Sequence, residues 1–364
     1  MKNKKFVFAV QGEGRGHLTQ ALTLSKSFQE DGHTVCCVIL GRDPHKEVPD
    51  FFMNKINAPV IQVESPRFSM NASGTSLNLK KTVLTTFGRW NIYKQSLARI
   101  KEVVDHYNPD IVVNFFEPLI SLYVLNYTRK FKIISIAHQY IYLHKKFRFP
   151  HGFPVQATLL KWYTRFTSLG SDKILALSMY ELPDSQKSKL MITPPALRKE
   201  LFHKKSEEGG FILIYVMSSG FMKDIMNWHK KNPDTRLICF TDNRDVKERY
   251  KGLYKVDETL SFHSLDDEKF LDLMSTCSAL VSTAGFESVC EAIYLGKPVM
   301  LVPIKGHFEQ YCNAKDAERI GAGIYADKFD LDILNKKLLI PQATTKHYVD
   351  WVNSFRSTLN LALQ

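Results

Sequence analysis

The chain has few cysteines, and none of them has the spacing of a metal site. Its six cysteines include no Cys-x-x-Cys pair, the spacing in which structural zinc ligands commonly occur. We therefore expect no metal and no other cofactor apart from a co-substrate. Cysteines that lie unpaired in apolar segments are typical of a reducing compartment, so we expect a cytoplasmic protein.

Long apolar runs are absent as well. No uninterrupted apolar stretch is long enough to span a bilayer. Residues 1–10 are basic and then apolar, but the apolar part is too short for a signal peptide and runs directly into a glycine-rich loop. Any membrane attachment is therefore expected to be peripheral, at the inner face of the cell membrane.

Acidic residues are scarce in the first half of the chain. Residues 1–195 hold 26 Lys+Arg against 14 Asp+Glu, whereas residues 196–364 hold 23 of each, so the first half carries the whole net charge of +12. Basic and aromatic residues alternate in 145–149 and 161–166, which suits the headgroup layer of an anionic membrane; a solvated basic surface is the alternative. No helix-turn-helix, zinc-finger or aromatic RNA-binding pattern accompanies the charge, so nucleic acid is not an expected partner.

The length and the order of elements indicate two α/β domains. The 364 residues are enough for two packed cores. Short apolar runs alternate with helical patterns before and after a proline-containing segment at 193–198, which predicts two doubly wound parallel sheets with helices on both faces. We predict a first domain at 1–195, a second domain at 196–343 and a helical tail at 344–364.

The most informative motif lies in residues 279–314. An apolar run typical of a buried strand is followed by a turn of small residues, Ala284 and Gly285, and then by a helical pattern that starts at Phe286. Small residues let a phosphate approach the backbone, and the free N–H groups that open a helix attract it. The motif predicts a diphosphate site; an ordinary strand-to-helix crossover is the alternative.

Polar side chains around this motif suit a sugar nucleotide. Glu291 lies about one turn beyond Glu287 on the same helix, where its carboxylate can accept hydrogen bonds from the two hydroxyls of a ribose. The loop after the next apolar run carries three groups that can reach the hydroxyls of a small, uncharged ligand: His307, Glu309 and Gln310.

A glycine-rich loop near the amino terminus forms the second motif. Gly14 and Gly16 precede His17 between an apolar run and a helical pattern that starts at Leu18. A dinucleotide fingerprint is the weaker interpretation, because the third glycine comes too early and no acidic residue ends the next apolar run. His17 can act as a general base, since imidazole titrates near neutral pH; a helix cap or a phosphate ligand is the alternative.

Four segments, taken in their order along the chain, resemble the donor half of glycosyltransferases of the GT-B fold. They are Gly-Phe-Glu at 285–287, Glu291, Gly-Lys-Pro at 296–298 and Glu-Gln-x-x-Asn-Ala at 309–314. The similar group, from families 28 and 1, includes the bacterial enzyme that adds N-acetylglucosamine to lipid-linked muramoyl-peptide, the plant galactolipid synthases and the UDP-glucuronosyltransferases. The resemblance covers nearly the whole chain. It implies two Rossmann-like, doubly wound parallel-sheet domains that face a central cleft. The first domain would bind the acceptor, the second would bind the donor, and the helical tail would pack back on the first domain.

The resemblance also implies roles for individual residues. Ala284, Gly285 and Phe286 would bind the diphosphate, Glu291 the ribose, and Glu309 with Gln310 the sugar hydroxyls. Further donor contacts are expected from four segments, for which an ordinary turn or a solvated side chain is the alternative: Gly14 and Gly16; Ser218, Ser219 and Gly220; Phe262 and His263; Glu287 and His307.

The partner of the base is less well defined. Relatives often carry an acidic residue at about the position of Phe115, whereas Glu117 is the only carboxylate at this point of the chain. Either Glu117 serves as base or partner, or His17 works without a carboxylate. His138 follows another apolar run, at the end of a strand where parallel sheets place ligands, and is as consistent with a structural role.

The sequence therefore predicts an inverting, metal-independent glycosyltransferase. It would move a sugar from a nucleotide-diphosphate sugar, a UDP-sugar, to an acceptor hydroxyl of a lipid or an anionic glycan. His17 would remove the acceptor proton while helix-start N–H groups stabilise the leaving diphosphate. A nucleotide-sugar 2-epimerase of the same fold and a non-catalytic sugar-nucleotide-binding or membrane scaffold protein are the alternatives.

Overall fold

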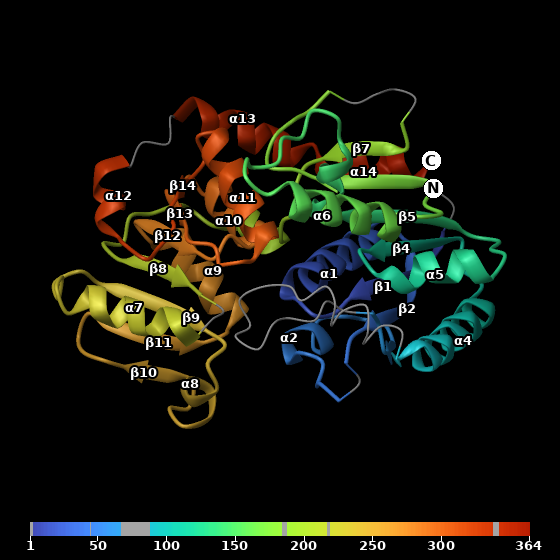
Figure 1. Ribbon diagram of the computed structural model, residues 1–364, viewed down its shortest axis with the longest axis horizontal. Helices are drawn as coiled ribbons and strands as arrows, with labels where there is room; N and C mark the ends of the chain where they lie inside the picture. Colours follow the sequence, from blue (N-terminus) through green and yellow to red (C-terminus); the bar gives the residue numbers. More distant parts are fainter. Residues whose placement is uncertain (1–2, 44, 67–87, 184–187, 217–218, 338–341) are drawn as a thin grey trace. The chain divides into compact units, whose positions relative to one another are not determined.

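The chain folds into two compact units. The structure, a computed structural model, describes residues 3–43, 45–66, 88–183, 188–216, 219–337 and 342–364. One unit consists of residues 1–198 together with 353–364, and the other of residues 199–352 (Figure 1). Within the described ranges, no helix combines the length and the apolar character that crossing a bilayer requires.

The first unit is built on a seven-stranded sheet in which every neighbouring pair of strands is parallel. In sheet order its strands are β3 (Val60–Val63), β2 (Thr34–Gly41), β1 (Lys5–Gln11), β4 (Ile111–Phe115), β5 (Lys132–Ala137), β6 (Lys173–Leu177) and β7 (Leu190–Thr193). The central strands β1 and β4 are mostly apolar and are buried on both faces except at the ends of β1, as expected for strands covered by helices on either side.

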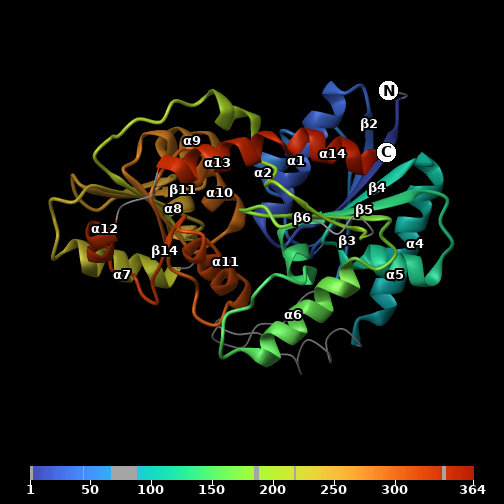
Figure 2. The same cartoon turned by 90° about the horizontal axis from the view of Figure 1, so that it is seen from above.

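Helices cover both faces of this sheet, as Figure 2 shows: α4, α5 and α6 lie on one face, and α1 and α14 on the other. The helical elements of the unit are α1 (Arg15–Glu30), α2 (Asp50–Met53), α4 (Trp90–Tyr107), α5 (Pro118–Asn126), η1 (His138–Leu143), α6 (Pro154–Thr167) and α14 (Phe355–Leu363). Apolar side chains of α4 and α5 pack with the strands into one core.

The second unit has a sheet of the same size with one antiparallel edge. In sheet order its strands are β10 (Leu253–Lys255), β11 (Leu260–Ser264), β9 (Leu237–Thr241), β8 (Ile212–Tyr215), β12 (Ala279–Ser282), β13 (Val299–Leu301) and β14 (Ile324–Tyr325). Strand β10 pairs antiparallel with β11, and all other pairs are parallel. Its helical elements are η2 (Lys199–His203), α7 (Ser219–His229), α8 (Arg244–Glu248), α9 (Asp267–Thr276), α10 (Phe286–Tyr294), α11 (Phe308–Arg319), α12 (Asp332–Lys337) and α13 (Gln342–Asn353).

Each sheet has a point at which the strand order reverses. The reversal falls between β1 and β4 in the first unit and between β8 and β12 in the second. Doubly wound sheets bind ligands outside the carboxyl ends of the strands at such points. The topology therefore directs attention to the loops after these four strands, which hold most of the residues singled out from the sequence.

The tail differs from the single segment expected at 344–364. It forms two helices that belong to different units, because α13 up to residue 352 groups with the second unit and α14 with the first. Tyr348 on α13 is buried, and its hydroxyl donates to Cys290 O at 3.3 Å. On α14, Arg356 pairs with Asp31, and Lys4 Nζ donates to Leu363 O at 2.6 Å.

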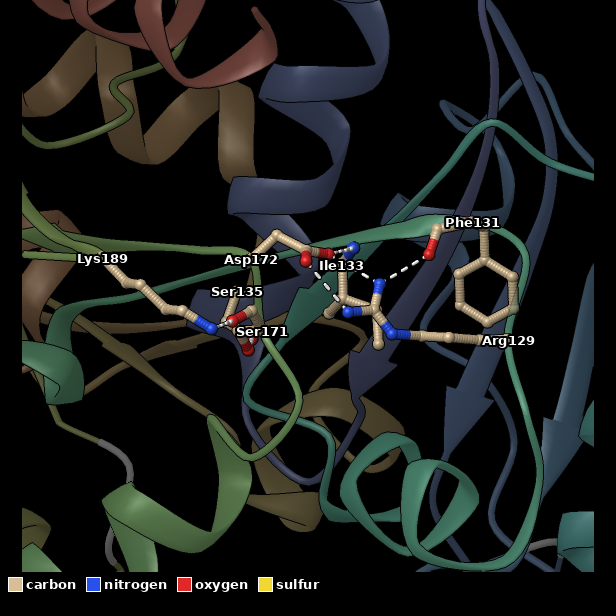
Figure 3. A network of polar contacts seen from close by, with 7 residues as sticks. All are labelled: Arg129, Phe131, Ile133, Ser135, Ser171, Asp172 and Lys189. Carbon is tan, nitrogen blue, oxygen red and sulfur yellow. Dashed lines mark hydrogen bonds and ion pairs between the residues drawn. The ribbon is translucent and has the colours of Figure 1, made fainter.

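A polar network fastens the amino-terminal ends of β5 and β6, at the edge opposite the ligand loops (Figure 3). Arg129 Nη1 and Nη2 donate to the two carboxylate oxygens of Asp172 at 2.6 and 2.9 Å, and the Ile133 N–H donates to Asp172 Oδ2 at 2.7 Å. The hydrogen bond from Arg129 holds the pKa of Asp172 below its usual range. Lys189 Nζ donates to Ser171 O at 3.1 Å, which ties the segment before β7 into the same network.

Replacing Asp172 by alanine should lower the free energy of unfolding by about 1–3 kcal/mol, because the Arg129 guanidinium would keep only its bond to Phe131 O and the Ile133 N–H would lose its acceptor. Urea denaturation measures this effect. The matched control is Asp105→Ala, which removes the exposed pair that Lys101 and Asp105 make along α4 and should cost clearly less, because water screens exposed pairs. Equal losses in the two variants would contradict a structural role for the network.

Candidate functional site

The turn between β12 and α10 is held in a strained conformation that leaves a helix end uncapped. Ala284 has φ of 64°, in the left-handed region that side-chain-bearing residues rarely adopt. Gly285 is the N-cap of α10 and has no side chain with which to accept from the first N–H groups of the helix. The turn therefore presents backbone donors and the positive end of the helix dipole at the strand-order reversal.

Helix α11 holds this turn in place. Asn313 is 2 % exposed, and its Nδ2 donates to Ala284 O at 3.0 Å. The side chain of His307 caps α11 by accepting from the Gln310 N–H at 3.4 Å, and burial lowers the pKa of His307. Gln310 Oε1 in turn accepts from the Ile304 N–H at 2.9 Å, so the group that Gln310 could offer to a ligand is its amide NH₂.

The two glutamates of α10 differ in exposure. Glu287 lies in the first turn and is partly exposed, whereas Glu291 is 2 % exposed. A ribose can therefore reach only a small part of the Glu291 carboxylate unless neighbouring side chains move. Glu309 lies in the first turn of α11 and is partly exposed, one residue before Gln310.

Helix α7 starts within the turn expected at 217–220, because its first residues are Ser219 and Gly220. Gly220 is exposed, and Ser218 lies outside the described residues. Helix α7 follows β8, the other strand at the reversal, so its start lies at the same edge of the sheet as the start of α10.

The segment expected to line a nucleotide base is largely buried. Phe262 is 0 % exposed and packs in the hydrophobic core of the second unit, so it has no surface to offer a base. His263 is 9 % exposed, stacks on Phe240 with ring centroids 5.4 Å apart, and has a pKa lowered to about 4 by burial. Its two ring nitrogens lie 3.1 Å from Ser261 Oγ and 3.2 Å from Lys269 Nζ.

In the first unit, helix α1 begins at Arg15 rather than at Leu18, which corrects the boundary expected from the sequence. Gly14 is the N-cap in extended conformation without a side-chain cap, and Gly16 and His17 belong to the first turn. The apolar pattern starts later than the helix because this first turn carries the glycine and the histidine instead of core residues. His17 is thereby fixed on a helix and not on a loop.

His17 is a buried, neutral imidazole with a defined neighbour on each side. Its side chain is 9 % exposed, and burial lowers its pKa to about 4. The ring stacks on Phe116 at 5.7 Å with 23° between the planes. Its Nδ1 lies 3.4 Å from Gln20 Oε1, which can only accept, so the ring proton is on Nδ1 and the lone pair on Nε2 is available as a base.

The chain after β4 places an aromatic ring, and no carboxylate, beside His17. Phe115 is 0 % exposed and packs against Phe8, so the position where relatives often carry an acid is core in this chain. Phe116 has φ of 62° and its ring covers the imidazole. In the described part of the chain, no hydrogen bond or ion pair joins His17 to Glu117.

Glu117 instead organises the connection between β4 and α5. Its Oε1 accepts from Ser65 Oγ at 2.5 Å and from the Leu119 N–H at 3.0 Å, which caps α5. Its Oε2 is buried without a hydrogen-bond partner among the described residues. This oxygen lies 1.9 Å from the position that a Cβ on Gly41 would occupy, so a side chain at position 41 would clash with it. Burial raises the pKa of Glu117 to about 7.

The variant Glu117→Gln should change how stability depends on pH. Folding raises the pKa of Glu117 from 4.5 to about 7, so the folded state favours the protonated carboxyl. The contribution of this group to stability is fully present below pH 4.5 and is lost as the pH rises through about 7. Glutamine does not titrate, and its amide oxygen can still accept from Ser65 and Leu119. The melting temperature of the variant relative to wild type should rise between about pH 5 and about pH 8 in thermal denaturation; a constant difference would contradict the raised pKa.

Two further side chains lie at the carboxyl edge of the first sheet. His138 follows β5 and is 2 % exposed, and its Nδ1 donates to Leu177 O at 2.8 Å, which ties it to the end of β6. Arg42 follows β2, and its Nε and Nη1 are buried without hydrogen-bond partners among the described residues. A guanidinium in this state favours an anion as its partner.

The similarity of the chain to known proteins decides its family, because residues 4–340 match the model of glycosyl transferase family 1. The chain belongs to this family. It is therefore a member of a glycosyltransferase family.

A curated relative supports this membership in glycosyl transferase family 1. The UDP-N-acetylglucosamine--N-acetylmuramyl-(pentapeptide) pyrophosphoryl-undecaprenol N-acetylglucosamine transferase of Alkaliphilus metalliredigens (strain QYMF) is 26% identical over 180 residues, which cover 43% of this chain and 48% of that protein. The match thus spans about half the length of that relative.

Solved structures confirm the expected GT-B fold. Arabidopsis thaliana UGT89C1, solved in complex with quercetin, is similar with a TM-score of 0.65 and 12% identity over 100% of this chain and 99% of that chain. LpCGTa, solved in complex with UDP, is similar with a TM-score of 0.60 and 12% identity over 99% of each chain. At this identity the likeness concerns the fold, which agrees with the two doubly wound sheets described above.

Four residues of the candidate site in this family 1 member were not identified from the sequence: Gln20, Ser65, Phe116 and Arg42. Gln20 stands three residues after His17 on a helix, a spacing that brings side chains together and could have revealed it. The other three come together only through the sheet order, which places the ends of β2, β3 and β4 at one edge.

Proposed function

We propose that this glycosyltransferase moves a sugar from a nucleotide-diphosphate sugar, most simply a UDP-sugar, to an acceptor hydroxyl with inversion at the anomeric carbon. The observation that carries the proposal is the uncapped start of α10 behind the strained Ala284, with Asn313 bonded to the Ala284 carbonyl. A strained residue of this kind persists only where the surrounding structure enforces its conformation, and such residues cluster at functional sites.

On the donor side, the second unit binds the diphosphate at the N–H groups that follow Gly285. The ribose contacts Glu291, and the sugar hydroxyls contact Glu309 and the amide N–H groups of Gln310. LpCGTa was solved with UDP bound, which supports a uridine nucleotide for a chain of the same fold. Among the described residues, no group of three or more His, Cys, Asp or Glu side chains is placed to bind a metal.

On the acceptor side, the first unit supplies the base. His17 Nε2 takes the proton of the acceptor hydroxyl, while Gln20 holds the Nδ1 proton in place. The acceptor oxygen forms its bond to the anomeric carbon on the face opposite the diphosphate, the bond from that carbon to the diphosphate oxygen breaks, and the nucleotide diphosphate leaves. The α10 amides stabilise the charge that develops on the leaving group.

The acceptor carries an anionic group in this proposal, a lipid phosphate or an acidic glycan. Arg42 lies at the edge of the sheet that also carries His17, and two of its guanidinium nitrogens are buried without acceptors among the described residues. An anionic group on the sugar acceptor would supply hydrogen-bond acceptors for these two nitrogens. The Alkaliphilus relative is named for a substrate joined to pyrophosphoryl-undecaprenol, which supports a lipid-borne acceptor.

Membership in a transferase family favours transfer over the 2-epimerase and scaffold alternatives. Turnover separates the three: a transferase releases free nucleotide diphosphate only when acceptor is present, an epimerase converts the donor without any acceptor, and a scaffold binds without turnover. Thermal stabilisation by a panel of nucleotide sugars would first identify the donor, because a ligand that binds only the folded form raises the melting temperature. The absence of nucleotide release with any acceptor mixture would overturn the proposal.

A further inference from the structure

Helix α6 exposes a stripe of apolar side chains to solvent. Only Thr164 and Thr167 of this helix are buried. Val155, Leu159 and Trp162 are 63%, 39% and 67% exposed, and Phe153, the N-cap residue, is 37% exposed. Val155, Leu159 and Trp162 recur at helical spacing on one face, and we call these three residues the α6 surface.

The position of α6 in its unit leaves this stripe without a covering element among the described residues. Helix α6 lies in the outer layer formed with α4 and α5 on one face of the first sheet (Figure 2). Single exposed apolar side chains are common on proteins, but a continuous stripe of large ones marks an interaction site. The stripe therefore indicates a partner that accepts apolar side chains.

The charge around the α6 surface has one sign. No aspartate or glutamate occurs between residues 118 and 171. Lys161 and Arg165 flank the stripe on α6 itself, and the preceding loop carries three further basic residues: Lys145, Lys146 and Arg148. An apolar stripe with a basic rim and no carboxylates is complementary to an anionic surface with an apolar interior.

We infer that the α6 surface is a peripheral docking site for an anionic lipid bilayer. The helix would lie in the plane of the interface, with Leu159 and Trp162 between headgroups and acyl chains and the basic side chains at the level of the lipid phosphates. A second copy of this chain fits less well, because a two-fold contact across the stripe would bring Lys161 and Arg165 of both copies together without any carboxylate.

The same helix connects this surface to the proposed base. On another face of α6, Tyr163 packs its ring against Phe116 with centroids 5.5 Å apart, and Phe116 covers His17. A bilayer at the α6 surface would therefore lie close to the edge of the sheet that carries His17. The docking itself does not depend on the proposed reaction, since it uses no residue to which that proposal gives a role.

The test measures co-sedimentation of the full-length protein with vesicles of phosphatidylcholine alone and of phosphatidylcholine mixed with phosphatidylglycerol. Wild type should bind the mixed vesicles, and binding should fall with added salt. The double variant Leu159→Ser with Trp162→Ser should lose about tenfold or more in partition coefficient. The matched control is Leu361→Ser, which removes a leucine of α14 that is 58% exposed on the opposite face of the sheet and should bind as wild type does.

The outcomes are distinguishable from failure of the proposed function. Nucleotide-induced thermal stabilisation of the double variant should equal that of wild type, which shows that it is folded and that its donor site is intact. The inference would be overturned if wild type did not bind anionic vesicles, or if the double variant bound them as strongly as wild type does. A wild-type dimer in analytical ultracentrifugation that the double variant lacks would assign the α6 surface to a second copy and overturn it as well.

Discussion

Replacing His17 by alanine should lower kcat by about 10²–10⁴-fold, the contribution usual for a general base. The neutral state of the imidazole and the Nδ1 contact to Gln20 leave Nε2 as the proton acceptor, and in the described part of the chain no hydrogen bond joins His17 to a carboxylate. Steady-state kinetics with saturating donor and acceptor measures the effect. The pH profile of wild type should also fall on the acid side, since His17 is protonated below a pKa of about 4.

Donor affinity serves as the internal control for this variant. The proposed donor residues belong to the other unit, so His17→Ala should bind the nucleotide as wild type does in calorimetry. The variant Gln20→Ala should lose less activity than His17→Ala, because Gln20 only orients the ring. Activity of His17→Ala close to that of wild type would remove His17 from the mechanism.

Replacing Gly285 by alanine should weaken nucleotide binding by at least about tenfold, which corresponds to the loss of one charge-assisted hydrogen bond of about 1.5–3 kcal/mol. The fold does not require glycine here: φ is −67°, and an added Cβ would meet only Ser288 Oγ, at an ordinary 3.7 Å. The methyl group would instead occupy the space through which a diphosphate approaches the N–H groups of α10. Isothermal titration with UDP measures the loss.

A second glycine provides the control for Gly285→Ala. Gly88 has nothing within 4 Å of an added Cβ, so Gly88→Ala should leave both stability and nucleotide affinity unchanged. The melting temperature of Gly285→Ala without ligand should also equal that of wild type. Undiminished UDP binding by a folded Gly285→Ala protein would show that the nucleotide binds away from the α10 start.

The fold, and the strand, turn and helix of the candidate donor motif, could be predicted because both are local in the sequence. Apolar runs of strand length alternate with helical patterns, and the small residues Ala284 and Gly285 stand directly between a strand and a helix. The antiparallel strand β10 escaped prediction because its three residues carry no apolar pattern, being exposed or half-buried. Phe262 looked like a ligand residue in the sequence, yet it is core, since burial depends on what packs against it from distant segments.

The surroundings of the base could not be predicted, for a physical reason. Whether an acid lies beside His17 depends on the backbone at Phe116, whose positive φ turns its ring onto the imidazole and leaves Glu117 to cap α5. Sequence spacing alone does not reveal such a reversal of side-chain direction. The helix start at Arg15 was missed in a similar way, because glycine and histidine in the first turn conceal it.

The account depends most on the diphosphate at the start of α10, and a crystal structure of the full chain with UDP tests it directly. We expect phosphate oxygens within hydrogen-bond distance of the backbone N–H groups that follow Gly285, and the ribose hydroxyls against Glu291. UDP bound at another place in the chain, with the α10 N–H groups unoccupied, would contradict the account.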